Sequence, residues 1–389
     1  MKSLSICVIT QQYRSVISGV GAYTQSLVAG LMASGHTITI VAPADQMSLQ
    51  DAALRFVEVP LPRLSSSQAR WISLAWSFAT TLAALQRSTT LDLVHFTDAR
   101  ESLFCRWNCP AVGDVHDSYA AEVRTPAYCR RYYDDWLTRW TYYRFVKFCE
   151  ARTYPRLDAV IANSHYTAKK IATQYAIAPG NLHVCYKTIQ QDRWARALQS
   201  RAQQAPHPRR VLFVGGNMQR KGLPTLIQAV SMARDAIPDL ELWVVGGDKA
   251  IEAMKGVCKA AGVDQQVHFW GRKDQEELVD LYAQSDVFVM PSLTEGFGLV
   301  FLEAMASGMP IIGSQAGGIA EVVEQGQNGI LVPPGDPIEL AAALRRLLTD
   351  PDLYARLKRV GLETAARFDL QSMMRCTTGV YQSVLGAGV

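Results

Sequence analysis

The sequence predicts an α/β protein with two doubly wound parallel sheets, each forming its own domain. Short apolar runs alternate with segments of helical periodicity along the whole chain, which is the order typical of parallel α/β sheets. The length of 389 residues is enough for two domains of ordinary size. A polar stretch with two prolines, residues 193–210, is predicted to link them, so that the boundary falls near residue 195.

The first half of the chain begins with a strand, a glycine-containing loop, a helix and a second strand, as expected at the start of a doubly wound sheet. Ser164 is a candidate N-cap, because its hydroxyl can accept a hydrogen bond from a free amide of the helix that follows. The expected strands are residues 4–10, 37–42, 56–59, 93–96, 111–115, 158–162 and 183–186, and the expected helices are residues 23–34, 65–87 and 165–175.

The second half repeats this alternation. Asp336, Pro337 and Glu339 have the order of an N-cap, a first-turn proline and a capping glutamate, so a helix is expected to start there. The expected strands are residues 211–214, 240–245, 267–270, 286–290, 310–313 and 329–332, and the expected helices include residues 299–306, 337–348, 352–366 and 370–385.

Composition excludes several classes of protein. A formal net charge of +4 is too small to indicate a nucleic-acid partner, and none is expected. The eight cysteines show no metal-ligand spacing, and we expect all of them to be reduced and mostly buried, as is typical of a cytoplasmic protein. The first ten residues are too short and weakly flanked for a signal peptide, and no apolar stretch approaches the roughly 20 residues of a membrane span.

Residues 289–313 hold the most informative pattern in the chain. A buried strand ends at Pro291, Gly296 and Gly298 bracket a tight turn, and a helix follows. Free amides at a helix start, approached closely through glycines, bind phosphate. Glu295 and Glu303 flank this turn, and carboxylates beside a phosphate site bind hydroxyls. The pattern indicates a sugar nucleotide, although an ordinary strand–turn–helix with solvent-facing glutamates has the same spacing.

The segment from Glu295 to Glu303 resembles the Glu-x7-Glu signature of retaining glycosyltransferases with the GT-B fold, especially glycosyltransferase family 4. The resemblance continues into the residues that follow, Ala-Met-Ala-Ser-Gly-Met-Pro. The resemblance implies two Rossmann-like domains facing across a cleft, with the last helix crossing back onto the first domain. It assigns residues 1–195 and about 370–389 to an acceptor-side domain, and residues 196–369 to a domain that binds a nucleotide sugar.

The resemblance also implies roles in the second domain. Residues 215–222 are similar to the family's Gly-Arg-x4-Lys-Gly segment, so Arg220 and Lys221 are expected at the diphosphate, although Gly216 stands where the family has an arginine. Glu295 is expected to hold sugar hydroxyls and Glu303 the ribose. The implied donor-binding residues are Gly19, Gly21, Gly215, Arg220, Lys221, Arg272, Glu295, Gly296, Phe297, Gly298, Leu299, Val300 and Glu303, and the implied catalytic residues are His116, Glu295, Arg220 and Lys221.

In the first domain, His116 follows a strand in a segment that resembles the family's His-Asp, and the matching histidine there touches the donor sugar. Gly19 and Gly21 resemble the family's acceptor-side glycine loop, with Ser18 in place of the first glycine. A dinucleotide fingerprint is disfavoured, because Thr24 stands where its third glycine would be. Lys187 lies in Tyr-Lys-Thr, where the family often has Pro-Asn-Gly.

The expected reaction is transfer of a hexosyl group, with retention, from a UDP- or GDP-linked sugar to a hydroxyl of a saccharide, a lipid-linked glycan precursor or a small molecule. Arg220, Lys221 and the amides of residues 296–300 would stabilise the leaving diphosphate. Neither a metal nor a cofactor other than the donor is expected. A phosphorylase that uses phosphate as acceptor, a non-catalytic partner subunit and an NAD-dependent oxidoreductase are the alternatives.

Residues 124–156, which begin with Arg124 and end with Arg156, are rich in both basic and aromatic side chains. Aromatic rings with polar tips and long arginine stems favour the boundary between lipid headgroups and water. Contact with an anionic membrane at its cytoplasmic face is one reading of this stretch. The other is that Trp136, Trp140 and Tyr143, which have helical spacing, belong to the core while the arginines face water.

Overall fold

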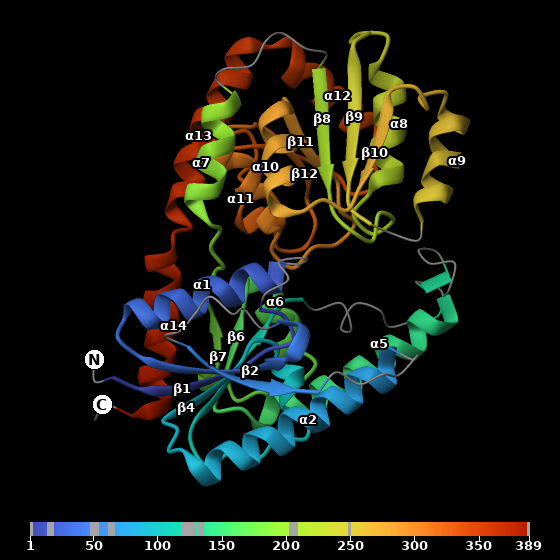
Figure 1. Cartoon of the computed structure of the whole chain (residues 1–389). Coiled ribbons are helices and arrows are strands. Elements are labelled where there is room, and N and C mark those ends of the chain that lie inside the picture. Colours follow the sequence, from blue (N-terminus) through green and yellow to red (C-terminus); the bar gives the residue numbers. More distant parts are fainter. Residues whose placement is uncertain are drawn as a thin grey trace. The chain divides into compact units, whose positions relative to one another are not determined.

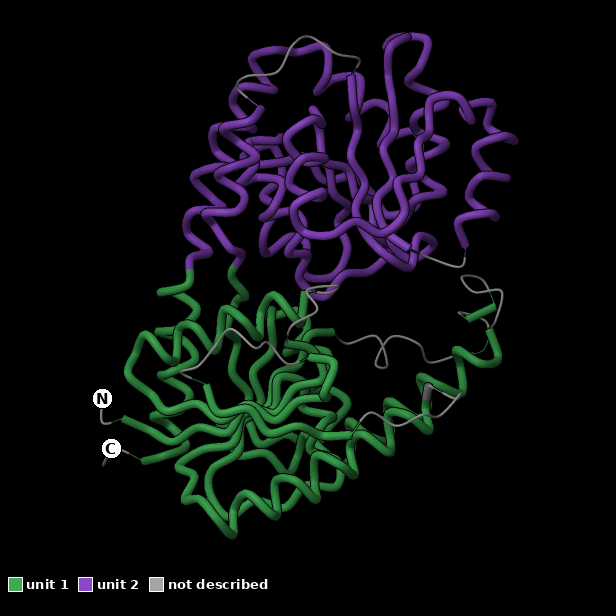
Figure 2. The backbone as a smooth tube through the Cα atoms, viewed as in Figure 1, with its two compact units in different colours: residues 1–188, 370–389 green, residues 189–369 purple. Residues whose placement is uncertain are grey.

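The computed structural model describes residues 3–13, 19–46, 54–60, 67–117, 126, 129–130, 136–201, 209–247 and 250–386 (Figure 1). The chain forms two compact units, shown in different colours in Figure 2. Unit 1 comprises residues 1–188 and 370–389, and unit 2 comprises residues 189–369. The predicted pair of parallel-sheet α/β domains is thus confirmed, with the division at residue 188 where the sequence suggested 195.

Unit 1 is built on a seven-stranded parallel sheet with the order β3-β2-β1-β4-β5-β6-β7. The strand order reverses between β1 and β4, and the carboxyl ends of strands at such a switch point are where ligands bind in open α/β sheets. The strands are β1 (Ser5–Ile9), β2 (Thr37–Pro43), β3 (Arg55–Val59), β4 (Leu93–Phe96), β5 (Ala111–Val115), β6 (Ala159–Ala162) and β7 (Leu182–Val184).

Helices cover both faces of this sheet, since successive side chains of a strand point to opposite faces. Ile6 and Val8 of β1 pack in one core with α1 and α14, whereas Cys7 and Ile9 pack in the other core with α2. The helices are α1 (Gly19–Ala33), α2 (Ser67–Ser88), α5 (Trp136–Thr153), α6 (His165–Ala172) and α14 (Leu370–Leu385), with short 3-10 turns η1 (Ala44–Gln46), η2 (Ala99–Ser102), η3 (Tyr154–Arg156) and η4 (Pro179–Asn181).

Unit 2 is built on a six-stranded parallel sheet with the order β10-β9-β8-β11-β12-β13. Here the order reverses between β8 and β11. The strands are β8 (Arg209–Val214), β9 (Leu240–Val245), β10 (Val267–Gly271), β11 (Val287–Met290), β12 (Ile311–Ser314) and β13 (Ile330–Val332). The helices are α7 (Gln191–Arg201), α8 (Leu223–Ala233), α9 (Ile251–Ala261), α10 (Gln275–Gln284), α11 (Leu299–Ala306), α12 (Pro337–Thr349) and α13 (Pro351–Arg367), and η5 (Gly317–Glu321) is a 3-10 turn.

Two predictions about individual segments are wrong: the interdomain link and the start of the first helix. The stretch expected to be an interdomain link is helical over its first part, because Trp194 and Ala197 form a narrow buried stripe that the surrounding polar residues hide in the sequence. Its Trp194 ring lies 4.7 Å from the ring of Tyr282 on α10. In addition, α1 begins at Gly19 and not at Tyr23, so Gly19 and Gly21 lie in the first turn of a helix instead of a loop.

The C-terminal helix returns to the first unit, as the resemblance implied. α14 packs against α1, where Gly30 leaves room for Met374: a Cβ atom at position 30 would lie 2.5 Å from the sulfur of that methionine. Cys376 of α14 forms a disulfide with Cys185, which directly follows β7. The expectation that all cysteines are reduced is therefore wrong for this pair, because two residues 191 positions apart in sequence meet only when the helix returns.

Reduction of this disulfide should destabilise unit 1. A cross-link that closes so long a loop restricts the unfolded chain, and its loss costs about 2–4 kcal/mol in free energy of unfolding. Denaturant unfolding with and without dithiothreitol measures the change, and the double variant Cys185→Ser with Cys376→Ser should not respond to the reductant. The account predicts six titratable thiols in the unreduced, denatured chain. Detection of all eight would contradict the assignment.

Candidate functional site

The loop between β11 and α11 brings the two signature glutamates of unit 2 to one helix N-terminus. Gly298 is the N-cap of α11 with a left-handed φ of 91°, and a Cβ atom there would lie 2.8 Å from the ring of Phe301. The helix starts at Leu299, as predicted. Glu295 precedes the turn, and Glu303 lies on the helix behind it. The first amides of a helix lack intrahelical acceptors in the preceding turn, so a helix start of this kind can bind an anion.

Arg220 binds the loop that carries Glu295. The residue is 8% exposed, and its Nη1 donates to the carbonyl oxygen of Thr294 at 2.6 Å. The same nitrogen lies 3.5 Å from Oε2 of Glu295. The backbone amide of Leu293 donates to the carbonyl of Arg220 at 2.8 Å, so the two loops are joined through main chain and side chain. The positive charge and the glutamate are thereby held at the same strand ends.

Lys221 lies over Gly215, the first glycine of the loop after β8. A Cβ atom at position 215 would lie 2.5 Å from Nζ of Lys221, so a larger residue there would displace the lysine. Burial lowers the pKa of Lys221, and the neighbouring Arg220 lowers it further, whereas Glu295 and Glu303 raise it. The structure thus groups Arg220 and Lys221, on the loop after β8, with Glu295, on the loop after β11, and Glu303, on α11.

Glu303 is held by a partner that the sequence did not indicate. The hydroxyl of Tyr282 on α10 donates to Oε2 of Glu303 at 3.1 Å. Burial raises the pKa of the Glu303 carboxyl to about 7, against the opposing effects of Tyr282, Lys221 and Arg193. The carboxylate therefore gains and loses its proton near neutral pH. A protonated carboxyl can donate one hydrogen bond, whereas the ionised form only accepts.

The remaining predicted residues of unit 2 lie along the neighbouring strand ends. Gly246 follows β9 and approaches Gly215 so closely that a Cβ atom at position 246 would lie 2.3 Å from the Gly215 carbonyl oxygen. Arg272 follows β10 and packs on Gly247, where a Cβ atom would lie 2.5 Å from its Nε. The loops after β8, β9 and β10 are thus stacked on one another, with Arg272 exposed at their end.

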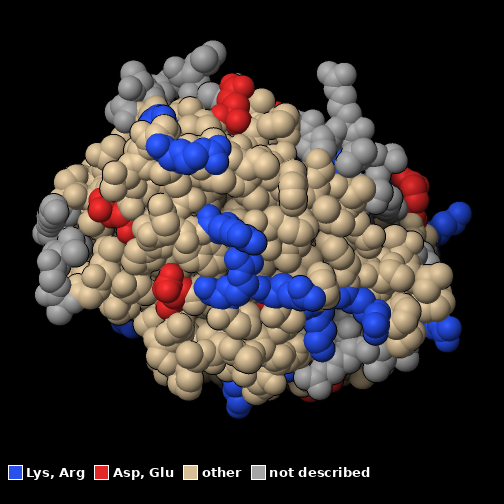
Figure 3. All heavy atoms as spheres, turned by 90° about the horizontal axis from the view of Figure 1, so that it is seen from below, with Lys and Arg blue, Asp and Glu red and all other residues tan. Residues whose placement is uncertain are grey.

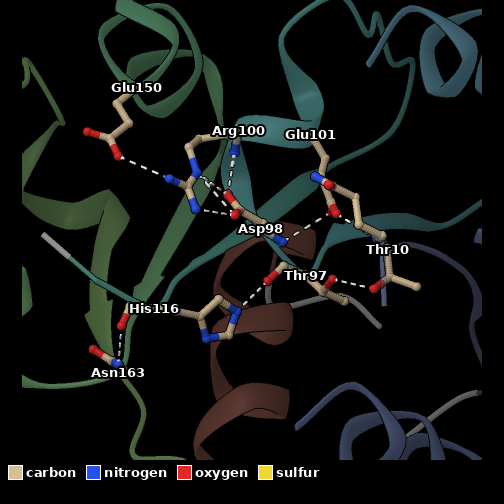
Figure 4. A network of polar contacts seen from close by, with 9 residues as sticks. Thr10, Thr97, Asp98, Arg100, Glu101, His116, Glu150 and Asn163 are labelled. Atoms are coloured by element: carbon tan, nitrogen blue, oxygen red, sulfur yellow. Dashed lines mark hydrogen bonds and ion pairs between the residues drawn. The ribbon is translucent and has the colours of Figure 1, made fainter. Parts of the chain in front are cut away.

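In unit 1, His116 lies directly after β5 with both its backbone and its ring fixed (Figure 4). Its Nε2 lies 2.5 Å from the carbonyl oxygen of Thr97, which can only accept, so this nitrogen carries the proton. The Nδ2 of Asn163 donates to the carbonyl oxygen of His116 at 2.6 Å. The Tyr23 ring of α1, the helix that begins with Gly19 and Gly21, meets the imidazole edge to face at 5.4 Å.

A buried polar network that includes Asp114, two residues before His116, lies in the same unit. Nζ of Lys187 lies 2.8 Å from Oδ1 of Asp114, whose Oδ2 lies 2.7 Å from Nε2 of His95. Nδ1 of His95 in turn lies 2.6 Å from the hydroxyl of Tyr381 on α14. Burial lowers the pKa of His116, and the positive charge of Lys187 lowers it further. His116 is therefore neutral at physiological pH, with Nδ1 as its acceptor nitrogen.

The described part of the basic and aromatic stretch forms α5, which has an inner and an outer side. Tyr143 and Val146 are buried with Cys129, and Trp136 and Trp140 pack against them. The core reading therefore holds for Tyr143 and in part for the two tryptophans. Leu137 and Phe148 remain 54% and 52% exposed, and the exposed cations on the helix are Arg144, Lys147 and Arg152. Figure 3 shows that Lys and Arg side chains form a connected run on one face of the molecule.

Residues 124–125, 127–128 and 131–135 of that stretch lie outside the described residues. Within the described residues, no helix combines the length and the apolar character needed to span a bilayer. In the same part of the chain, no three His, Cys, Asp or Glu side chains are grouped as ligands of a metal ion would be.

Sequence reasoning missed the residues that support the predicted ones. Gly317 lies against the Glu295 backbone, where a Cβ atom would be 2.0 Å from its carbonyl oxygen, and the amide of Gly318 donates to that oxygen at 2.8 Å. The Gly-Gly pair after β12 was the available signal. In the sequence, Lys187 stands out only as a departure from the family pattern. Nothing in the local sequence indicates that Tyr282 would contact Glu303, because they come from different helices.

Two family models match the chain, one in each half. Residues 17–193 match the model described as Glycosyltransferase Family 4, and residues 196–363 match the model described as Glycosyl transferases group 1. The two matches meet close to the division between units 1 and 2. The resemblance drawn from the signature segment is thus confirmed by both halves.

Individual proteins extend this likeness. The D-inositol 3-phosphate glycosyltransferase of Corynebacterium jeikeium is 29% identical over 256 residues, which span 62% of this chain but only 61% of that relative. The MMP alpha-(1->4)-mannosyltransferase of Mycolicibacterium hassiacum is 26% identical over 98% of both chains. The crystal structure of Anabaena HepE in complex with UDP and glucose superposes with a TM-score of 0.72 and 20% identity, covering 98% of this chain and all of that one. That structural likeness shows the fold.

The carboxyl of Glu303 should titrate near neutral pH. Carbon-13 NMR of glutamate carboxyls in the full chain should show a resonance with a midpoint near pH 7 that is absent in Glu303→Gln. Burial also raises the pKa of Glu150 to about 7, so a second such resonance should remain in that variant. The Tyr282 hydrogen bond favours the ionised form, so Tyr282→Phe should move the Glu303 midpoint upward. Tyr354→Phe removes a hydroxyl that donates to the Asp286 carbonyl and serves as the matched control. A Glu303 midpoint in the ordinary range near 4.5 would contradict the burial of this group.

Proposed function

Because the chain belongs to the glycosyltransferases of family 4 and group 1, with the GT-B fold, we propose that it transfers a hexosyl group with retention from a UDP- or GDP-linked sugar to a hydroxyl acceptor. The acceptor is a saccharide, a lipid-linked glycan precursor or a small molecule. The observation that carries this proposal is the grouping of Arg220 and Lys221, from the loop after β8, with Glu295 and Glu303, which flank the start of α11. HepE, of the same fold, was crystallised with UDP and glucose.

Departure of a nucleoside diphosphate builds negative charge on its outer phosphate. Arg220 and Lys221 supply positive charge, and the amides that begin α11 supply donors fixed in place before the reaction. These groups would stabilise the leaving phosphate without a metal ion, and the proposal includes no cofactor other than the donor. Lys221 is partly shielded from water, which strengthens its interaction with a bound phosphate.

The two glutamates would bind the ends of the donor. Glu303 accepts hydrogen bonds from the ribose hydroxyls, and its near-neutral pKa makes this grip stronger as the pH rises through about 7. Glu295, held close to Arg220, accepts from hydroxyls of the sugar. In unit 1, the fixed carbonyl and neutral ring of His116 would contact the sugar, and α1 with Gly19 and Gly21 would face the phosphates.

Activity is tested with a panel of UDP-, GDP- and ADP-linked sugars and simple sugar acceptors, by measuring release of nucleoside diphosphate and the anomeric configuration of the product by NMR. We expect turnover in excess EDTA and an α-linked product from an α-linked donor. Activity that disappears with EDTA and returns with magnesium would refute metal independence. Turnover that requires inorganic phosphate would identify a phosphorylase, and donor binding without any turnover would indicate a non-catalytic subunit.

Replacement of the proposed ribose ligand should weaken donor binding. Glu303→Ala removes a hydrogen bond to a charged group, which is worth roughly 1.5–3 kcal/mol, so the affinity measured by calorimetry should fall about 10- to 150-fold. Glu252→Ala removes a glutamate from the exposed surface of α9 in the same unit and should leave the affinity unchanged. Equal donor affinity in Glu303→Ala and the parent chain would contradict the proposal that Glu303 binds the ribose.

We further propose that unit 1 docks on the cytoplasmic face of an anionic membrane through the outer side of α5. Arg144, Lys147 and Arg152 supply charge, while Phe148 and Leu137 supply exposed apolar surface on the same helix. The Arg152 guanidinium lies 4.8 Å above the Phe148 ring, so charge and apolar surface are adjacent. Such a surface suits the boundary between headgroups and water, where a lipid-linked acceptor presents its hydroxyl.

Co-sedimentation with vesicles tests this surface. Each cation near an anionic membrane contributes about 1 kcal/mol, so Arg144→Glu with Lys147→Glu should lower binding roughly thirtyfold or more at low salt. The double variant Lys255→Glu with Arg359→Glu makes the same charge change on exposed residues of unit 2 and should bind as the parent does. Equal recovery of the parent chain in the supernatant with and without phosphatidylglycerol, at low and high salt, would rule out docking.

A further inference from the structure

A cavity of about 200 Å³ lies in unit 1 at the carboxyl ends of β1 and β4. These are the two strands between which the sheet order reverses, the position where open α/β sheets bind ligands. Gln11 and Gln12 line it directly after β1, and Asp98, Arg100 and Glu101 line it after β4. The cavity is smaller than the roughly 300–1,000 Å³ of pockets for drug-sized ligands, so its volume suits one ring instead of a whole lipid.

The polar side of this cavity is held rigidly (Figure 4). Nε of Arg100 donates to both carboxylate oxygens of Asp98, at 2.8 and 3.0 Å, and Nη2 donates to Oδ2 at 2.5 Å. The two oxygens of Glu101 accept from the backbone amides of Gln11, at 2.8 Å, and Asp98, at 3.2 Å. Thr97 and Thr10 join the same two strand ends through their hydroxyls at 2.8 Å.

The charge of this polar side is balanced within itself. Among the described residues that line the cavity, Arg100 is the only cation, and Asp98 binds it along one edge. Its Nη1 faces a further carboxylate, Oε1 of Glu150, at 3.8 Å. Burial, together with the nearby Asp98, raises the pKa of Glu101, whereas its hydrogen bonds from the backbone amides of Asp98 and Gln11 lower it. A phosphate placed here would meet carboxylates and a guanidinium already bound by them, and it would lose its hydration without gaining a new cation.

The opposite side of the cavity is aromatic. Trp71 of α2 and Phe145 of α5 meet edge to face at 5.6 Å, and Tyr142 lines the cavity beside them. A sugar or cyclitol ring has apolar C–H faces and hydroxyls around its edge. Such a ring can place a face on the aromatic side while its hydroxyls reach Glu101 and Asp98, whose carboxyl oxygens can each accept more than one hydrogen bond.

We propose that this cavity is the acceptor subsite, and that it selects an uncharged, hydroxyl-bearing ring and disfavours the same ring carrying a phosphate. The inference rests on the proposed glycosyl transfer and adds the chemical class of the acceptor. The position of the cavity agrees with that role. Asp98, which lines the cavity, follows Thr97, and the Thr97 carbonyl accepts a hydrogen bond from the ring of His116. His116 is the residue proposed to contact the donor sugar.

Saturation-transfer NMR on the full chain with bound nucleoside diphosphate tests the proposal. The probes are inositol, glucose, mannose and galactose, each compared with its phosphate monoester. We expect at least one uncharged ring to bind and its phosphate ester to bind about tenfold more weakly or worse. Preference for a phosphate ester over its parent ring, or binding of none of the four uncharged rings, would overturn the proposal.

Two variants assign the binding to this cavity. Trp71→Leu removes an aromatic side chain on a partly exposed helix face, and Glu101→Gln keeps the shape while changing the carboxyl. Each should weaken the uncharged ring about tenfold. The matched controls are Trp76→Leu, a 61% exposed residue farther along α2, and Glu58→Gln, exposed on the edge strand β3. Unchanged binding of the uncharged ring in both cavity variants would show that the ring binds outside this cavity and would contradict the proposal.

The same samples separate this inference from the proposed function. Nucleoside diphosphate binding, measured by calorimetry before the rings are added, tests the donor site in unit 2 alone. Absence of that binding would contradict glycosyl transfer itself, whereas normal diphosphate binding with a preferred phosphorylated ring would contradict only the acceptor class. Retained diphosphate affinity in Trp71→Leu would show that the variant is folded.

Discussion

The buried guanidinium of Arg220 is the constraint on which the donor side of unit 2 depends. A charge in this position requires acceptors, and it finds them in the Thr294 carbonyl oxygen at 2.6 Å and the Glu295 carboxylate at 3.5 Å. These contacts join the loop after β8 to the loop after β11 at the point where the strand order reverses. Lys221 and the start of α11 are positioned by the same connection. The groups proposed to meet a diphosphate are therefore fixed before any ligand arrives.

Unit 1 joins its strand ends in the same way, through an acidic side chain. Glu101 joins the loops after β1 and β4 through two backbone amides, and Asp98 holds Arg100 beside it. In both units, a buried ionisable side chain thus connects strand ends across the switch point of the sheet. The chemistry then differs: unit 2 presents cations and free amides suited to phosphate, whereas unit 1 presents a balanced ion pair and an aromatic side suited to an uncharged ring.

Much of the fold was predictable because buried parallel strands are short apolar runs and helices have strong end signals. α11 (Leu299–Ala306) and α14 (Leu370–Leu385) begin and end where the sequence indicates, and Ser164 caps α6 through the amide of Thr167.

The predictions that failed did so because tertiary contacts decide those parts of the structure. The α7 helix is stabilised by burial of Trp194 against another helix, and Cys185 meets Cys376 only after the chain returns to unit 1. For the candidate site, spacing indicated Glu295 and Glu303, and the family resemblance implied Arg220 and Lys221. The contacts of Tyr282 and Gly317 emerged only from packing.

The central claim is that Arg220, Lys221 and the start of α11 bind the diphosphate of a nucleotide. Calorimetric titration with uridine, its monophosphate and its diphosphate, and with the guanosine series, measures the contribution of each phosphate directly. The account predicts that one series gains at least about tenfold in affinity at the second phosphate, and that Arg220→Met abolishes this gain. Equal affinity for nucleoside and nucleoside diphosphate in both series, or an undiminished gain in Arg220→Met, would contradict it.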